Sequence, residues 1–473
     1  MKRRFHLHPW ELWTYKKLRL LRKTALGKFI DERILNNPDL RIPFQAIPLW
    51  VASILTGLVA VAYENLFILF EHLGKGIWTL SPWMVFLTTP LFFVLAWYVT
   101  TRFAPNTRGS GIPQLLAAVD LAGTPRHPLI RQLLGVRIGL IKIGSSLLLL
   151  LGGGAIGREG PTLQVAGSIF QTVYRFIPEN WARVSQRIML ITGGASGLAA
   201  AFNTPLGGIV YALEELTKTH IARFRTAVFS AVIIAGMTAQ TFLGPYLYLG
   251  YPKLAPLPLS LIWSVIVLAF LSGYLGAQFT QALLWLGEMR RRYRERKQQV
   301  GFVLVLSLLF AGMVFFTGDI SMGTGKPLIN TILFEGAASA PWYTFPVRFA
   351  GAALSFSVGA AGGIFATSLS SGASLGAFLV YWGGLPMEHH NLLILVCMIG
   401  FLTGVTHTPF TAAILVLEMT DRHSAIFYFL LAGMVAHLAA LQVMKHSYYE
   451  IQKEVFLESL GGKEVKEEGP AKV

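Results

Sequence analysis

The stretch Gly157-Arg158-Glu159-Gly160-Pro161 lies between two mainly apolar runs, Ile143 to Ile156 and Thr162 to Phe170. A carboxylate at membrane depth costs at least ~2.5 kcal/mol on the most lenient insertion scale, so Glu159 is predicted to serve a function. The surrounding glycines let the backbone turn and leave amides unpaired, which a lipid-facing helix does not need. This stretch therefore predicts an interrupted helix inside a membrane protein.

The composition supports a membrane protein. Of 473 residues 53% are hydrophobic and only 14% are charged, and the mean hydropathy is +0.55. The net charge of +16 gathers in basic clusters such as Arg290 to Lys297, which the positive-inside rule assigns to the cytoplasm. No aromatic stacking platform accompanies the arginines, so nucleic acid is not an expected partner. The basic N-terminal segment lacks the pattern of a cleavable signal peptide, and both termini are predicted to be cytoplasmic.

The apolar segments predict an all-α polytopic fold, at about 20 residues per crossing. Seven are long enough, or nearly so, to span: Ile47 to Leu69, Trp83 to Val99, Ile138 to Ile156, Ala227 to Leu243, Leu259 to Leu286, Phe302 to Phe316 and Ala425 to Val443. Shorter stretches, among them Ile188 to Ala201 and Ile394 to Val405, are typical of helices that stop partway. We therefore expect one membrane domain at 47–450, between a basic segment at 1–46 and a tail at 451–473.

An internal repeat divides this domain at about 47–248 and 259–450. Three segments recur in the same order: Gly109-Ser110-Gly111-Ile112-Pro113 with Gly323-Thr324-Gly325-Lys326-Pro327, Gly157 to Pro161 with Gly363-Ile364-Phe365-Ala366-Thr367, and Thr204 to Glu215 with Thr408 to Met419. Their offsets are nearly constant, so chance is a poor explanation. Duplicated halves with interrupted helices are typical of transporters whose substrate binds at the repeat interface.

The repeated turns also predict an anion site. A helix N-terminus carries unpaired amides and about half a positive charge, and Ser110 adds a hydroxyl between Gly109 and Gly111. The amides of Ile364 and Phe365, after Gly363, are the equivalent donors of the second half. The simpler interpretation, that these are only tight glycine turns, does not account for three ordered segments.

Glu159 is predicted to compete with the anion when it is charged and to release the site when it is protonated. The alternative is a buried structural ion pair with Arg158. Glu214 and Glu215 end the helix after Pro205, where one acid can pair with a cation and the other can take up protons; a solvated helix end is the alternative. Glu418, the repeat counterpart, is interpreted as structural.

No enzyme chemistry is expected. The eleven histidines show no ligand spacing, so no metal site is predicted, and neither a nucleotide-binding loop nor a nucleophile with its base appears. The single cysteine, Cys397, lies in an apolar run and is interpreted as core filling.

Tyr448 and Tyr449 follow the last apolar run. Two interpretations are open: the tyrosines belong to an aromatic belt at the membrane surface, or a phenol donor closes the anion site.

With these motifs the chain closely resembles the CLC family of chloride channels and chloride/proton antiporters, from about residue 45 to 450. The resemblance implies two inverted halves of tilted helices, a homodimer with one pore per subunit, and a prokaryotic-type member in the plasma membrane without appended cytoplasmic domains. It implies no cofactor, with chloride and protons as substrates.

Residue by residue, the resemblance implies that Ser110 and the amides of Ile364 and Phe365 hold the central chloride. Glu159 is then the gate and proton acceptor, with Gly157 and Gly160 as its supporting turn. Tyr448 resembles the inner-gate tyrosine.

Glu215 resembles the internal proton-transfer glutamate of antiporters, which favours exchange over passive conduction. The chain departs from the family pattern at Thr367, where proline is usual, and at Gln114 to Leu116, where some relatives carry acids. An uncoupled chloride channel and an anion-binding scaffold or sensor remain the alternatives.

Overall fold

The computed structural model describes residues 38–177, 184–217, 225–244 and 247–461, with side chains from residue 44. Apart from two isolated bridges, these residues form helices and turns. The first half comprises α3 (Pro38–Leu80), α4 (Val85–Phe103), α5 (Ile112–Leu121), α6 (Ile130–Leu133), α7 (Val136–Leu151), α8 (Glu159–Phe176), α9 (Gln186–Phe202), α10 (Pro205–Tyr211), the π-helical turn η5 (Ala212–Leu216) and α11 (Arg225–Leu243). The second comprises α12 (Leu261–Arg292), α13 (Arg296–Thr317), α14 (Lys326–Phe334), α15 (Thr344–Ser357), α16 (Phe365–Trp382), α17 (His390–Thr406), α18 (Pro409–Thr420), α19 (Ile426–Val443) and α20 (Tyr448–Gly461).

Eight helical segments in the described residues are long and apolar enough to cross a membrane. Seven correspond to the predicted segments. The eighth, Met387–Thr406, contains the run Ile394 to Val405, for which the prediction of a short broken helix was wrong. Its length was missed because the segment begins with the polar residues Glu388 to Asn391. Because 94% of its apolar stretch is buried, α17 crosses inside the protein, where it packs against α12 and α16.

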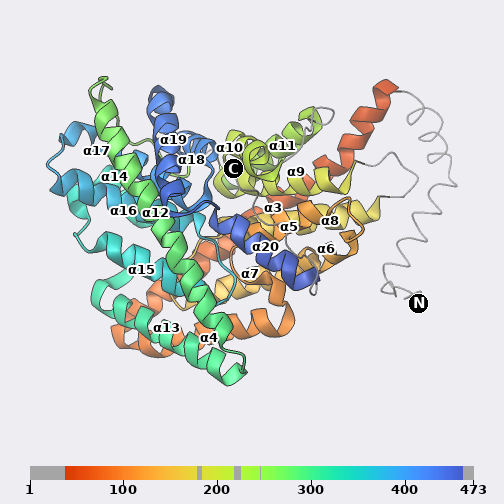
Figure 1. Ribbon diagram of the computed structural model, residues 1–473, viewed down its shortest axis with the longest axis horizontal. Coiled ribbons are helices and arrows are strands. Elements are labelled where there is room, and N and C mark those ends of the chain that lie inside the picture. Colours follow the sequence, from red (N-terminus) through yellow and green to blue (C-terminus); the bar gives the residue numbers. More distant parts are fainter. Residues whose placement is uncertain (1–37, 178–183, 218–224, 245–246, 462–473) are drawn as a thin grey trace, which may run out of the picture.

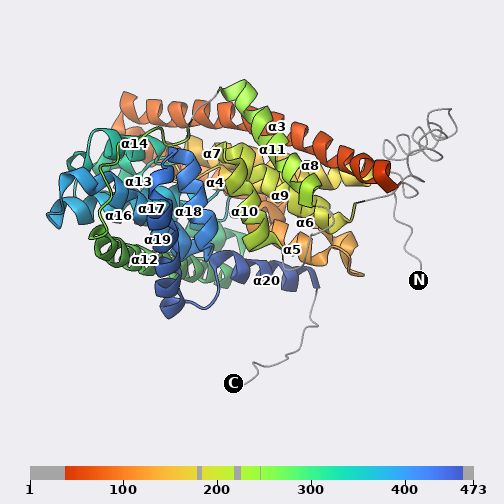
Figure 2. The same ribbon diagram turned by 90° about the horizontal axis from the view of Figure 1, so that it is seen from above.

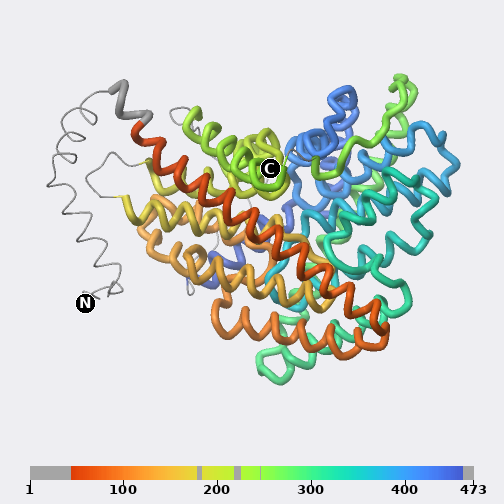
Figure 3. The backbone as a smooth tube through the Cα atoms, turned by 180° about the vertical axis from the view of Figure 1, so that it is seen from behind, coloured from red at the N-terminus to blue at the C-terminus, as the bar shows by residue number. Residues whose placement is uncertain are grey.

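Two helices extend beyond the predicted limits of the membrane domain. Helix α3 begins at Pro38, before the predicted start of the membrane domain, and residues 1–37 lie outside the described part. Helix α20 continues to Gly461, through the first half of the predicted tail, and packs on α5. Helices α3 and α20 run along opposite sides of the molecule (Figure 2), and from behind α3 crosses the first half diagonally (Figure 3).

The repeat is visible as equivalent helix boundaries. Helices α9 and α17 end at Asn203 and His407, both left-handed with φ 57°. A Thr-Pro pair then starts α10 and α18, because proline suits the first helical position. The two halves lie side by side, with α5 to α11 on one side and α14 to α19 on the other (Figure 1).

Two carboxylates show how the halves are oriented. Glu214, after α10, accepts hydrogen bonds from the amides of Phe410 and Thr411 at the start of α18, at 3.1 and 2.7 Å. Glu418, near the end of α18, accepts from the amides of Leu206 and Gly207 at the start of α10, at 3.0 and 2.6 Å. Each helix thus ends where the other begins, so the equivalent helices are antiparallel and the repeats are inverted. The predicted fold class is confirmed, and Glu418 has the structural contacts that were expected.

Candidate anion and proton site

The glycine turns of the two halves meet at the centre of the molecule. Gly157 and Gly363 exchange both backbone hydrogen bonds, at 2.8 and 2.7 Å, and form an antiparallel bridge. Gly109 donates to the carbonyl of Ala360 at 2.8 Å, and the amide of Gly362 returns a bond of 3.1 Å to Gly109. Helices α5, α8 and α16 therefore begin next to one another, and their positive ends converge on one region.

Close packing explains two of the glycines. A Cβ on Gly160 would collide with the hydroxyl of Ser110, and one on Gly157 would collide with the carboxylate of Glu159. Ser110 and Glu159 thus each lie against the backbone of the Gly157 to Pro161 turn. The turn brings the two side chains within one small volume, although 49 residues separate them in the chain.

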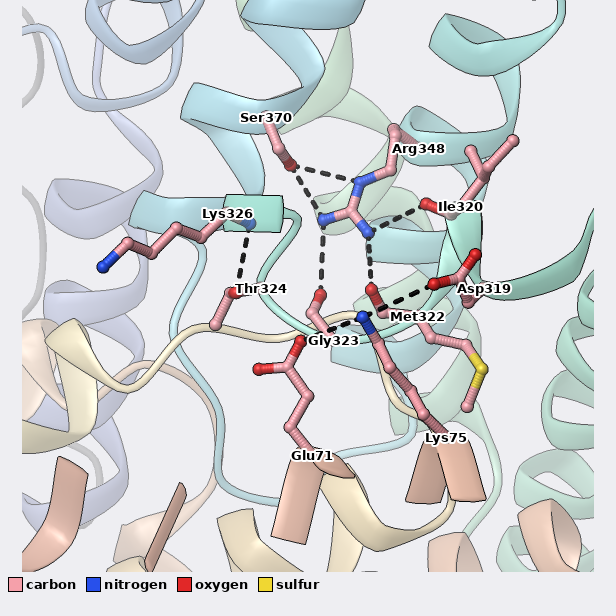
Figure 4. A network of polar contacts seen from close by, with 10 residues as sticks. All are labelled: Glu71, Lys75, Asp319, Ile320, Met322, Gly323, Thr324, Lys326, Arg348 and Ser370. Carbon is pink, nitrogen blue, oxygen red and sulfur yellow. Dashed lines mark hydrogen bonds and ion pairs between the residues drawn. The ribbon is translucent and has the colours of Figure 1, made fainter. Parts of the chain in front are cut away.

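Buried cations hold the turns that precede α5 and α14. Lys142 donates to the carbonyls of Thr107 and Gly109, at 2.8 and 2.6 Å. In the second half, Arg348 donates to the carbonyls of Ile320, Met322 and Gly323 at 3.2, 3.0 and 3.3 Å and to the hydroxyl of Ser370 (Figure 4). Both cations are fully buried, and their carbonyl partners satisfy them while fixing the glycine turns.

Glu159 is fully buried at the first position of α8. Its Oε1 accepts a long hydrogen bond, 3.4 Å, from the hydroxyl of Tyr248, whereas Oε2 has no hydrogen-bond partner among the described residues. The carboxylate lies beside the amides of Glu159 itself and Ala366. Arg158 makes its ion pair with Glu64 of α3, at 2.7 Å.

Ser110, Ile364 and Phe365 are buried at the same junction. The hydroxyl of Ser110 has no hydrogen-bond partner in the described part of the chain. Helix α16 begins at Phe365 despite the departure at Thr367, whose hydroxyl donates to the carbonyl of Ile364 at 3.1 Å. With threonine at position 367, the helix begins at Phe365.

The two tyrosines of α20 take different positions. The ring of Tyr449 stacks on that of Phe365, with centroids 6.0 Å apart and planes 12° apart, and its hydroxyl lies near that of Ser110. The Tyr449 hydroxyl has no hydrogen-bond partner within the described ranges. Tyr448, the predicted ligand, packs against Phe356, with ring centroids 5.7 Å apart and planes 72° apart, and lines a pocket that Gly109 and Ser110 also line. Adjacent side chains at the start of a helix point in different directions. The packing of α20 therefore decides which of the two tyrosines faces Phe365.

Glu214 and Glu215 are also separated in role. Glu214 is held by the N-terminus of α18, as described above, and also accepts from the hydroxyl of Thr411 at 2.6 Å. Glu215 is half-buried and close enough to Tyr211 and Tyr449 to interact electrostatically with both phenols. Tyr211 is fully buried, and its hydroxyl has no hydrogen-bond partner in the described residues.

Two tyrosines of this region escaped the sequence reasoning: Tyr211 and Tyr248. The sequence contained a signal for Tyr211, because it places a hydroxyl in a mainly apolar helix one turn before Glu215. Gln114 donates to the carbonyls of Asn106 and Arg108 and thereby holds the segment before α5. Among the described residues, no group of histidine, cysteine and acidic side chains has the geometry of a metal site.

Comparisons with known proteins agree on one family. A family model described as voltage gated chloride channel matches residues 91–441. The H(+)/Cl(-) exchange transporter ClcA of Salmonella typhimurium is 29% identical over 446 residues, with 89% of each chain covered.

Solved structures of similar fold include a slow cyanobacterial Cl-/H+ antiporter, with a TM-score of 0.75 and 23% identity over 89% of this chain and 98% of that one. A CLC-type fluoride/proton antiporter has a TM-score of 0.74 and 19% identity over 88% of this chain and 99% of that one.

Proposed function

The chain belongs to the voltage-gated chloride channel family, and from this premise we propose that it exchanges chloride for protons across a membrane. The single observation that carries the proposal is Glu159, a fully buried carboxylate among converging helix N-termini, with one oxygen that has no hydrogen-bond partner in the described residues. The name of the Salmonella relative, an H(+)/Cl(-) exchange transporter, agrees with it. The anion is chloride, and no cofactor takes part.

Chloride is held by the hydroxyls of Ser110 and Tyr449 and by the amides of Ile364 and Phe365. Both hydroxyls are buried and have no hydrogen-bond partner in the described residues, and an unpaired buried hydroxyl is costly unless a ligand or water satisfies it. We assign Tyr449 to the role that the resemblance suggested for Tyr448, because Tyr449 is the tyrosine that stacks on Phe365.

The charged carboxylate of Glu159 competes with chloride for the same helix N-termini, because both are anions. When Glu159 takes up a proton, its attraction to these amides falls, and chloride displaces it. Each ion thereby changes the affinity of the site for the other, which is the thermodynamic requirement for coupling.

Protons reach Glu159 from Glu215 by way of the buried phenols of Tyr211 and Tyr449. The electrostatic proximity of Glu215 to both phenols supports this order. Tyr211→Phe removes only a hydroxyl, so it is expected to slow proton transfer while chloride still moves. Unchanged proton transport in that variant would remove Tyr211 from the path.

The protein is proposed to work as a homodimer in a prokaryotic plasma membrane, with the side of the molecule that carries α20 in the cytoplasm. Exposed apolar side chains on α10, α11, α18 and α19, such as Leu206, Met237 and Phe427, are compatible with a subunit interface as well as with lipid. Cross-linking of single cysteines at Leu206 in liposomes tests the dimer.

The central experiment is ion flux in liposomes that contain the purified protein. A chloride gradient is imposed and proton movement is recorded. Protons driven against their own gradient support exchange; chloride current alone would identify an uncoupled channel; absence of flux with retained chloride binding would identify a scaffold or sensor.

Two variants then test the assigned roles. Glu159→Ala is expected to keep chloride passage and abolish proton coupling, because no carboxylate remains to carry the proton. Glu215→Gln is expected to reduce proton transport while chloride continues. Retained coupling in either variant would contradict the role given to that residue.

A further inference from the structure

A small pocket opens beside the anion site, on the side of the molecule that carries α20. Its lining includes Gly109 and Ser110 from the turn before α5, Arg108, two arginines at the end of α12, Arg290 and Arg291, and Tyr448. Because Ser110 also belongs to the proposed chloride site, whatever occupies the pocket lies at the entrance to that site. We call this feature the arginine pocket.

The three guanidinium groups lack acidic partners. Among the described residues, none of Arg108, Arg290 and Arg291 makes an ion pair with a carboxylate. Other cations of the same molecule are paired: Lys453 of α20 lies 2.9 Å from Asp120, and Arg158 lies 2.7 Å from Glu64. Three uncompensated positive charges around one cavity point to an anionic ligand.

Packing holds two of these groups, Arg290 and Arg108, at the cavity. Arg290 donates to the carbonyl of Ser357 over a long 3.4 Å and lies against Gly359, where any Cβ would collide with it. Arg108 lies over the ring of Phe456, with its guanidinium carbon 5.5 Å from the centroid. Burial lowers the pKa of Arg108, and the charge of Arg291 lowers it further, so these two cations repel each other at short range.

Further hydrogen-bonding capacity is unused. The hydroxyl of Ser357, which also lines the pocket, is buried and has no hydrogen-bond partner in the part of the chain described. The cavity has a volume of about 40 Å³. Since about 10–15 Å³ holds one water molecule, a ligand of several atoms fits better than a single small ion.

We propose that the arginine pocket binds a divalent oxyanion, of the phosphate or sulphate class, that obstructs chloride entry from the α20 side. Planar guanidinium groups match the paired oxygens of such anions and favour them over a spherical monovalent ion. Obstruction of chloride flux rests on the proposed function, whereas oxyanion binding does not. The phosphate group is either free or part of a lipid headgroup.

The first experiment measures binding without transport. Inorganic phosphate is titrated by calorimetry into the full-length protein in phosphatidylcholine nanodiscs. Arg291→Gln and Arg108→Gln are each expected to weaken binding at least about 10-fold, because each removes a charge-assisted hydrogen-bond donor. Arg292→Gln is the matched control, because Arg292 is exposed at the same helix end and does not line the pocket.

Equal phosphate affinity in the parent and in Arg291→Gln would overturn the proposal, as would an equal loss in Arg292→Gln. Arg291 is exposed, so its variant is expected to fold even if Arg108→Gln does not. Nanodiscs with phosphatidylglycerol separate the two sources. A headgroup in the pocket lowers the apparent affinity for free phosphate in the parent but not in Arg291→Gln, whereas equal affinity in both lipids identifies free oxyanion as the ligand.

The second experiment measures chloride flux in liposomes with phosphate or gluconate on each side in turn. Phosphate is expected to slow flux, and Arg291→Gln is expected to relieve the block. If the protein carries no chloride but binds phosphate through Arg291, the pocket assignment stands and the proposed function fails. If chloride moves and phosphate neither binds nor slows it, the pocket assignment fails alone.

Discussion

The ion pair between Arg158 and Glu64 offers a quantitative test of how Glu159 is positioned. Arg158 directly precedes Glu159, and its Nη2 lies 2.7 Å from Oε1 of Glu64 on α3. The two side chains are only 5% and 7% exposed. The substitution Glu64→Gln keeps the size of the side chain and removes its charge, so the buried Arg158 loses the carboxylate of this ion pair.

The expected loss follows from that burial. Breaking a buried pair by removal of one partner costs about 3–5 kcal/mol, because the remaining charge is uncompensated. Arg158 keeps a second acceptor, the carbonyl of Ala201 at 2.9 Å, and glutamine still offers an oxygen. We therefore expect a loss near the lower limit, about 3 kcal/mol of unfolding free energy.

The assay is unfolding by SDS in mixed micelles, followed by tryptophan fluorescence, on Glu64→Gln, Arg158→Gln and the double variant. The double variant is expected to lose about 1–3 kcal/mol less than the sum of the single losses, because neither charge then remains buried. Glu450→Gln is the matched control. Its partner His446 and Glu450 itself are 64% and 42% exposed, so a loss under about 1 kcal/mol is expected.

Additive losses in the double variant would refute the reasoning, since they would mean that the two charges do not stabilise each other. A loss in Glu64→Gln no larger than that in Glu450→Gln would refute it as well. In flux measurements Glu64→Gln is expected to weaken proton coupling, because the turn that holds Glu159 loses its anchor to α3.

Three further predictions use the same preparations. Tyr449→Phe should weaken chloride binding about 5-fold or more in calorimetry, the value of one hydrogen bond, while Tyr448→Phe leaves it unchanged; the reverse pattern would favour Tyr448 as ligand. Glu418→Gln should lower the unfolding free energy by about 1.5–3 kcal/mol, because the amides of α10 lose a charged acceptor, and a neutral effect would contradict that role. Burial lowers the pKa of His407 to about 4, with a contribution from His437. The imidazole is therefore protonated below about pH 6.5 in the unfolded state but only below about pH 4 in the folded state. The unfolding free energy consequently decreases as the pH falls from 6.5 to 4. His407→Asn should reduce that loss by up to about 3 kcal/mol. If the variant keeps the pH profile of the parent, His407 is not the source of the loss.

Much of the fold was predictable because its signals are local. Apolar segments of sufficient length identified seven of the eight spanning helices, and the Thr-Pro pairs marked the starts of α10 and α18. The length of α17 was underestimated because the polar residues at the start of its segment shorten the apolar run. Its burial depends on α12 and α16, which lie elsewhere in the sequence.

The sequence by itself determined that this is a duplicated membrane protein with glycine turns and a carboxylate at its centre. These properties depend on composition and on residues within a few positions of one another. Only the tertiary structure decided which distant side chains meet: Glu64 with Arg158 within the first half, Tyr449 with Phe365 within the second, and Glu214 and Glu418 with each other's helices across the two halves. The physical reason is that such contacts join residues roughly 80 to 210 positions apart, and the direction of a side chain at a helix start is set by how that helix packs.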